Sequence, residues 1–135
     1  QRLRESTLDD TPDLELGNVV IERILPDVFV PAPAQGALAV QCRQADEALC
    51  GVLRILDNAE TRRCVHAERT LLARVEGGCD TAFGAYADAD PSTARLFRLT
   101  ALLDHEGELL TGKASGPDPL ALADSVWKHL EKKLR

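Results

Sequence analysis

The chain has 135 residues, of which 44% are hydrophobic and 28% charged, so it is long enough for one ordinary core and too short for two. This composition is typical of a soluble globular protein and excludes a fibrous or largely disordered chain. No apolar run approaches the ~20 residues of a membrane span, and a formal net charge of -6 argues against a general nucleic-acid or anionic-membrane surface.

The cysteine pattern matches neither a zinc site nor a disulfide framework. The four cysteines are Cys42, Cys50, Cys64 and Cys79, and none forms a Cys-x-x-Cys pair. We therefore expect free thiols in a reduced, cytoplasmic setting. No metal site is expected, because Cys64 and His66 lie two residues apart on a predicted helix and point in different directions.

The start of the chain indicates a fragment. The chain contains no methionine and begins at Gln1. Because translation starts with methionine, we expect a processed product or a piece of something longer. Residues 1–17 are polar and acidic and predict a loop or a frayed terminus.

The first third predicts strands with no helix to cover them. Residues 18–25 are rich in β-branched side chains and predict one strand, and residues 37–43 predict another. Between them lie a short apolar run at 28–30, a proline-rich crossing and a break at Gln35-Gly36. Because isolated strands are marginal, we expect these to join sheets whose other strands lie elsewhere.

Two helices are predicted next. Apolar residues repeat at helical spacing over 45–56, and a second helix is predicted over 59–75, with Asp57 and Glu60 as a capping signature. The apolar face of the second helix is Cys64, Ala67, Leu71 and Val75.

Four arginines lie on the polar side of the second helix: Arg62, Arg63, Arg69 and Arg74. We favour a solvated face with ion pairs to residues such as Glu68 and Glu76, because surface charges usually do no more than this. The functional alternative is a cationic rim for an anionic ligand near Cys79.

The last third predicts an antiparallel meander and a final helix. Alternating segments predict strands at 81–87, 95–103 and 108–114, with a hairpin loop at 104–107. Asp118 is the expected N-cap of the last helix, with Pro119 at its first position. Its predicted buried stripe is Leu120, Ala123, Val126, Trp127, Leu130 and Leu134.

Residues 44–135 therefore predict an α+β fold, in which a small three-stranded antiparallel sheet carries three helices on one face.

A candidate nucleophile follows the second helix in the stretch Glu76-Gly77-Gly78-Cys79. Two glycines allow positive φ angles beside a thiol that can act as a nucleophile. The local alternative is that the glycines only end the helix and that Cys79 is an ordinary thiol.

Two segments together carry a family resemblance. The first, residues 31–43, has the sequence Pro-Ala-Pro-Ala-Gln-Gly-Ala-Leu-Ala-Val-Gln-Cys-Arg. The second, residues 67–79, has the sequence Ala-Glu-Arg-Thr-Leu-Leu-Ala-Arg-Val-Glu-Gly-Gly-Cys and is followed by Phe-Gly-Ala-Tyr at 83–86. The chain from about Val20 onward closely resembles hydroxymethylbilane synthase, also called porphobilinogen deaminase.

The resemblance implies a three-domain enzyme that joins four porphobilinogen molecules into a linear tetrapyrrole with loss of ammonia, in porphyrin and heme biosynthesis. It implies a dipyrromethane cofactor bound to Cys79 through a thioether, with Gly77 and Gly78 beside it. It also implies that Gln35 and Gly36 lie on a strand of the first domain and line the cofactor cleft. A thiolate suits this role, because it is a soft nucleophile for an electrophilic methylene carbon.

The resemblance also implies what the chain lacks. Residues 1–43 would be the tail of the second domain and the returning strands of the first, and residues 44–135 the C-terminal cofactor-anchoring domain. The family's catalytic aspartate and carboxylate-gripping arginines would lie in missing N-terminal parts, so the isolated chain is predicted inactive. The sequence departs from the family at Ala34, where glycine is usual, and at 80–82 after the cysteine.

The expected partners are porphobilinogen, pyrrole intermediates and the missing N-terminal domains, with no nucleic acid and no membrane. One alternative is a non-catalytic interaction module that docks on a separate N-terminal chain by strand addition through residues 18–43. Another is an unrelated thiol enzyme that uses Cys79 with His66 or His105 as base, although no spacing supports such a pair.

Overall fold

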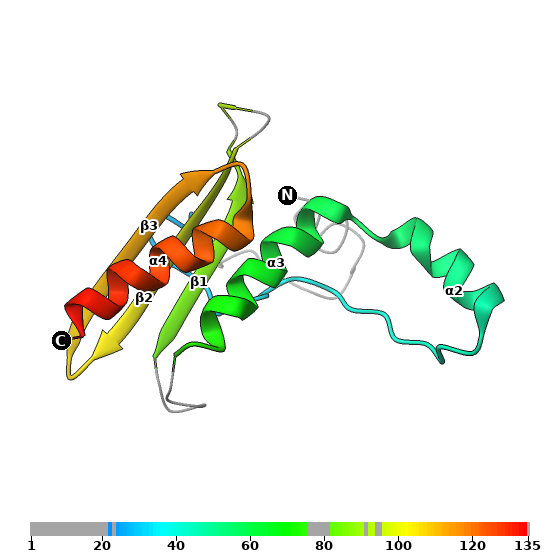
Figure 1. Ribbon diagram of the computed structural model, residues 1–135, viewed down its shortest axis with the longest axis horizontal. Helices are drawn as coiled ribbons and strands as arrows, with labels where there is room; N and C mark the ends of the chain where they lie inside the picture. The colour runs from blue at the N-terminus through cyan, green and yellow to red at the C-terminus, as the bar shows by residue number, and fades with distance from the viewer. Residues whose placement is uncertain (1–21, 23, 76–81, 91, 94–95, 135) are drawn as a thin grey trace, which may run out of the picture.

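The computed structural model describes residues 22, 24–75, 82–90, 92–93 and 96–134 (Figure 1). Its elements are helix α2 (Glu47–Leu53), the 3₁₀ turn η1 (Arg54–Leu56), helix α3 (Ala59–Leu72), strands β1 (Phe83–Ala89), β2 (Phe97–His105) and β3 (Glu108–Gly116), and helix α4 (Pro119–Lys133). The predicted α+β class, with a three-stranded antiparallel sheet and three helices, is confirmed.

The sheet is a simple meander. Its strand order is β1-β2-β3, and both neighbouring pairs are antiparallel. Glu106 and Gly107 connect β2 to β3 with φ values of 53° and 84°, the left-handed conformations that a tight hairpin turn requires. The three predicted strands are confirmed. The first two lie two residues further toward the C-terminus than predicted, and the third starts at Glu108 as predicted and ends two residues later.

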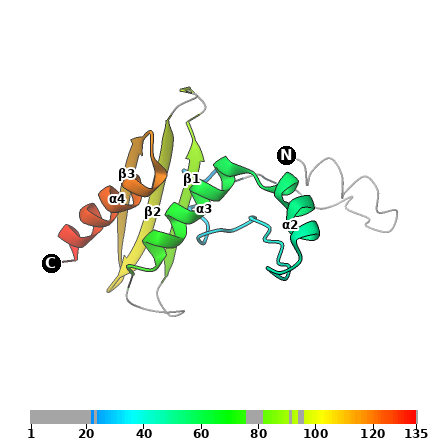
Figure 2. The same ribbon diagram turned by 45° about the vertical axis from the view of Figure 1, so that its right-hand side comes forward.

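The core lies between one face of the sheet and helices α3 and α4 (Figures 1 and 2). Helix α3 packs on β1, and α4 packs on β2 and β3. Alternate residues of β2 are buried, as the period of two predicts. The largest fully buried side chains are Leu71, Leu99, Leu130, Val126 and Pro119.

The start of α3 differs from the prediction. Its N-cap is Asn58, whose Oδ1 accepts a hydrogen bond from the Thr61 N–H at 2.9 Å. The prediction that Asp57 caps this helix is wrong. The Asp57 carboxylate instead forms an ion pair with Arg62 at 3.2 Å. Asparagine and aspartate cap helices about equally well, so propensity alone could not place the boundary.

The start of α4 agrees with the prediction. Asp118 is its N-cap and accepts from the Leu120 N–H at 3.2 Å, with Pro119 at the first position. The buried stripe needs one correction, because Leu122 is buried and Leu120 is exposed. Trp127 is partly buried and packs against the core.

Helix α2 lies away from the sheet (Figures 1 and 2). Its N-cap Asp46 accepts from the Leu49 N–H at 3.0 Å. None of its residues is buried, so of the three predicted helices, α3 and α4 supply the cover of the sheet. Helices this short are marginal in water without tertiary packing, and among the described residues α2 buries none of its side chains.

Residues 24–40, which we call the arm, pass the edge strand β1 at Val30 and Pro31. The Ala85 N–H of β1 donates to the Pro31 carbonyl at 3.0 Å, so the arm covers part of the sheet edge. The strand predicted at 37–43 is wrong in this structure, because the described residues offer it no partner strand. Most of the strand predicted at 18–25 lies outside the described residues.

Gly84→Ala is expected to push the arm off β1. A Cβ at Gly84 would lie 2.8 Å from the Val30 carbonyl oxygen and 3.2 Å from that of Pro31, and backbone atoms cannot move aside cheaply. We expect a loss of about 1–3 kcal/mol in the free energy of unfolding and faster hydrogen exchange of the Ala85 amide. Gly51→Ala is the control, because a Cβ there meets open space. Unchanged exchange at Ala85 in Gly84→Ala would contradict this packing.

Candidate functional site

The predicted site residues divide into two groups. Gln35 and Gly36 are described, whereas Gly77, Gly78 and Cys79 lie outside the described residues. In the chain, the second group falls in the connection between α3 and β1. The proximity of the two groups, which the resemblance implies, therefore stays a prediction.

Gln35 and Gly36 lie in a turn and not on a strand, contrary to the expectation from the resemblance. The Gln35 N–H donates to the Ala32 carbonyl at 3.1 Å, and the Ala37 N–H donates to the Ala34 carbonyl at 3.2 Å. Gly36 has φ 80° and Ala34 has φ 62°. The break predicted at Gln35-Gly36 is thus confirmed, and both residues are exposed.

The φ of Ala34 explains why glycine suits this position. A left-handed residue with a Cβ costs roughly 1–2 kcal/mol, which glycine avoids. Ala34→Gly is therefore expected to raise the free energy of unfolding by about 0.5–1 kcal/mol, since strain relief exceeds the added chain entropy of glycine. Ala32→Gly is the control and should lower stability, because Ala32 does not have a positive φ. Equal effects of both variants in urea unfolding would show that Ala34 is unstrained.

A buried carboxylate fastens this turn to the core. Glu68 of α3 is only 5% exposed. Its Oε2 accepts from the Ala34 N–H and its Oε1 accepts from the Ala87 N–H of β1, each at 2.7 Å. We call this arrangement the Glu68 clamp. It joins the arm, α3 and β1 through one side chain.

The ionisation of Glu68 reflects two opposing influences. Burial raises the pKa of the carboxyl, and the hydrogen bonds from the Ala87 and Ala34 amides lower it in part, leaving the pKa above its ordinary value. The prediction that Glu68 pairs with surface arginines is wrong. Helical spacing could have found it, because Glu68 lies four residues after Cys64 and three before Leu71 on the buried face.

A small pocket of about 260 Å³ lies beside the turn. Gln35 and Gly36 line it together with three acidic residues, Glu60, Glu68 and Asp88. No arginine or lysine is among its described lining residues. By itself this pocket disfavours an anionic ligand.

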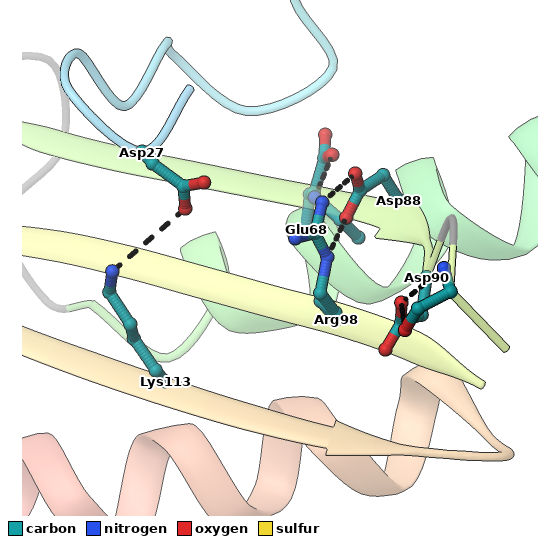
Figure 3. A network of polar contacts seen from close by, with 8 residues as sticks. Asp27, Glu68, Asp88, Asp90, Arg98 and Lys113 are labelled. Carbon is teal, nitrogen blue, oxygen red and sulfur yellow. Dashed lines mark hydrogen bonds and ion pairs between the residues drawn. The ribbon is translucent and has the colours of Figure 1, made fainter. Parts of the chain in front are cut away.

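The face of the sheet that points away from α3 and α4 carries paired charges (Figure 3). Arg98 of β2 donates to both Asp88 oxygens on β1, at 3.1 and 2.5 Å. Lys113 of β3 lies 3.9 Å from an Asp27 oxygen on the arm. The first pair joins two strands of the sheet, and the second reaches from the sheet to the arm, so both cations already have carboxylate partners.

The polar side of α3 is largely the solvated face that we favoured. Three of its arginines pair with aspartates: Arg62 with Asp57, Arg63 with Asp118, and Arg74 with Asp124. The Arg63 guanidinium also lies 4.8 Å from the centroid of the Phe97 ring. Arg69 lines a groove described next.

An apolar groove of about 910 Å³ separates α3 from the end of the arm and η1. Its lining includes Leu38, Val40, Leu53, Leu56 and Val65. Among these residues, Leu38 is 97% exposed and Leu56 is 69% exposed. Apolar side chains gathered along an exposed groove are typical of surfaces that another domain or protein covers.

Within the described ranges, no group of three or more histidine, cysteine, aspartate or glutamate residues could hold a metal ion. No helix in these ranges has the length and apolar character needed to cross a membrane.

Comparison with known proteins agrees with these features. Residues 62–135 match the family model "Porphobilinogen deaminase, C-terminal domain". Three relatives, each named porphobilinogen deaminase, are similar to the chain. The protein from Mycolicibacterium gilvum is 54% identical over 70 residues, which are 52% of this chain and 22% of that protein. The one from Geobacillus kaustophilus is 43% identical over 107 residues (78% and 34%), and the one from Brevibacillus brevis is 38% identical over 113 residues (82% and 36%).

The two longer matches cover 78% and 82% of this chain, and all three span little more than a third of each relative at most. The family model alone covers more than half of this chain and takes in α4, the whole sheet and nearly all of α3. The chain thus belongs to the porphobilinogen deaminase C-terminal domain family.

Proposed function

We propose that this chain is the C-terminal part of a porphobilinogen deaminase, in which it anchors the dipyrromethane cofactor and docks on the N-terminal domains. Residues 44–135 would form the anchoring domain, and residues 1–43 would belong with the other two domains. The observation that carries the proposal is the exposed apolar surface of the arm and η1. It lies on a chain whose match covers only 34% of the length of the Geobacillus kaustophilus relative.

The anchor would be Cys79, flanked by Gly77 and Gly78. This assignment is supported by the Glu-Gly-Gly-Cys motif in the connection between α3 and β1. When bound, dipyrromethane supplies a pyrrole carbon to which substrate units are added. The described residues do not by themselves fit its carboxylate groups, since the pocket at Gln35 and Gly36 is acidic and has no cation among its described lining. The cations would have to come from the N-terminal domains.

The chain's own described residues would position the other domains. The Glu68 clamp fixes the turn that carries Gln35 and Gly36. The exposed apolar residues beyond that turn, Leu38 and Val40, would then be buried against a neighbouring domain. Each fully buried side chain of this size contributes about 1.5–3 kcal/mol, so the association would be substantial.

Assays of bilane formation test this proposal. The isolated chain is expected to show no turnover of porphobilinogen, and addition or co-expression of the missing N-terminal part is expected to restore it. Measurable turnover by the isolated chain would contradict the proposal, because it would require acid–base groups that we place elsewhere.

A second candidate is a non-catalytic interaction module that adds a strand to a separate N-terminal chain. The unpaired residues 37–43 favour it, because they are extended in sequence preference but have no ladder partner among the described residues. Gel filtration of the chain mixed with the N-terminal part, combined with the assay of bilane formation, separates the candidates. A stable complex without turnover supports the module, whereas a complex with turnover supports the split enzyme.

A further inference from the structure

Two cysteines that the sequence pattern left unpaired meet in the structure. The Sγ atoms of Cys42 and Cys50 are 3.5 Å apart. Cys42 lies just after the arm, and Cys50 lies in the first turns of α2. Both thiols are reduced in this structure, and both are partly exposed.

Local backbone geometry brings the two thiols together. The Asp46 N–H donates to the Arg43 carbonyl at 3.1 Å, which makes a turn between the two cysteines. Asp46 then caps α2, and the Cys50 N–H donates to the Asp46 carbonyl at 2.9 Å. The Cys50 thiol also lies 3.7 Å from the Arg43 carbonyl oxygen. The turn and the cap thus hold Cys50 over Cys42 without any contact from the core.

We propose that Cys42 and Cys50 form a reversible thiol-modification site that reacts with small-molecule disulfides such as oxidised glutathione and closes into an intramolecular disulfide. The sulfur separation is short enough that rotation of the two side chains, with small shifts in α2, would bring it to the ~2.05 Å of a bond. Because α2 buries no residue, such a shift breaks no core packing.

The reaction balances in two exchange steps. One protein thiolate attacks oxidised glutathione, forming a mixed disulfide and releasing one glutathione thiol. The second protein thiolate then attacks the protein sulfur of that mixed disulfide and releases the second glutathione. The two cysteines lose two electrons and two protons in total, and one glutathione disulfide is reduced to two thiols.

The contrast with Cys64 makes the site selective. Cys64 is buried in the core, and burial, with nearby carboxylates, raises the pKa of its thiol to about 11. The pKa of the Cys42 thiol is raised as well, chiefly by its hydrogen bond with Cys50. The exposure of the pair, and not its acidity, therefore distinguishes it from the enclosed Cys64. Cys64 therefore serves as an internal reference that should stay reduced while the exposed pair reacts.

Closure would tether α2 to the end of the arm. In the reduced chain α2 depends on its cap and on η1. A disulfide between Cys42 and Cys50 would fix one face of α2 next to residues 37–43. The site would thereby link the thiol redox state to the apolar surface that we propose for docking, although its chemistry does not depend on that proposed function.

Peptide mapping tests the site. The reduced 135-residue chain is incubated with glutathione buffers of increasing oxidised fraction, quenched with acid and an alkylating agent, and digested with trypsin. Arg43, Arg54 and Arg63 place Cys42, Cys50 and Cys64 on separate peptides. We expect a crosslink between the Cys42 and Cys50 peptides, with Cys64 alkylated throughout and slower hydrogen exchange in α2.

Single-cysteine variants sharpen the test. Cys42→Ser is expected to accumulate a glutathione adduct on Cys50, because no second thiol is present to displace the glutathione. Cys50→Ser is expected to accumulate the corresponding adduct on Cys42. Cys64→Ser is the matched control and should still form the crosslink. Stable glutathione adducts on both Cys42 and Cys50 of the unaltered chain would overturn the proposal, as would a crosslink that forms as readily with Cys64.

Discussion

Glu68→Ala is expected to lower the free energy of unfolding by about 2–4 kcal/mol. The Glu68 clamp satisfies two backbone donors from segments far apart in the sequence, Ala34 and Ala87. Removal of the carboxylate leaves these N–H groups without their partner, and each unsatisfied buried donor costs about 1–3 kcal/mol. Urea unfolding of the variant and the unaltered chain measures the difference.

Two further variants separate the clamp from a general loss of charge. Glu68→Gln retains one oxygen acceptor and replaces the other with a donor, so its stability should fall between those of the alanine variant and the unaltered chain. Glu60→Ala removes an exposed carboxylate from the same helix and should change stability by less than about 1 kcal/mol. If Glu68→Ala and Glu60→Ala were equally mild, the clamp would not contribute to folding.

The effect of Glu68→Ala should depend on pH. Because the pKa of Glu68 is raised in the folded chain, the folded state binds more protons than the unfolded state at pH values between the two pKa values. The contribution of Glu68 is therefore fully present below the unfolded value of about 4.5 and declines as the pH rises through the folded pKa. The difference between variant and unaltered chain should be larger at pH 4 than at pH 7.

Cys79→Ser in the complete enzyme is expected to reduce turnover by about 10³-fold or more, as loss of an essential covalent group does in other enzymes. A serine hydroxyl is a far weaker nucleophile than a thiolate for an electrophilic carbon. The purified variant should therefore carry no covalent pyrrole cofactor. Bilane formation and the mass of the intact protein measure the two effects.

The control for Cys79→Ser is Cys50→Ser. Cys50 lies in α2, which has no buried residue, so its replacement should leave bilane formation unchanged under reducing conditions. Near-normal turnover of Cys79→Ser, with the cofactor still attached, would show that another residue is the anchor.

Periodicity predicted most of the C-terminal fold. The alternation in β2 and the helical spacing of Ala67 and Leu71 both mark the buried faces correctly. Asp118 and Pro119 marked the start of α4, because aspartate is favoured at the N-cap and proline at the first position of a helix. These signals lie within a single helix or strand, so they can be recognised without knowing which elements pack against it.

Features that depend on distant partners could not be predicted in the same way. Residues 37–43 have the composition of a strand, but strand formation needs a neighbour that the described chain does not provide. Glu68 was interpreted as a surface charge because carboxylates are seldom buried, and its two donors come from 34 residues upstream and 19 downstream.

The candidate site was predictable only as a motif. The sequence singles out Cys79 and its two glycines, and it predicts a break at Gln35-Gly36, where the structure has a turn. The acidity of the pocket beside that turn depends on how α3 and β1 meet, which no local pattern encodes.

Mass spectrometry of the Cys79 peptide tests the central claim most directly. The chain would be co-expressed with the missing N-terminal part, purified and digested under reducing conditions. The account predicts a covalent two-pyrrole adduct on Cys79 and on no other cysteine, in a preparation that forms bilane. An active preparation in which Cys79 is a bare thiol, or in which the adduct lies on another cysteine, would contradict it.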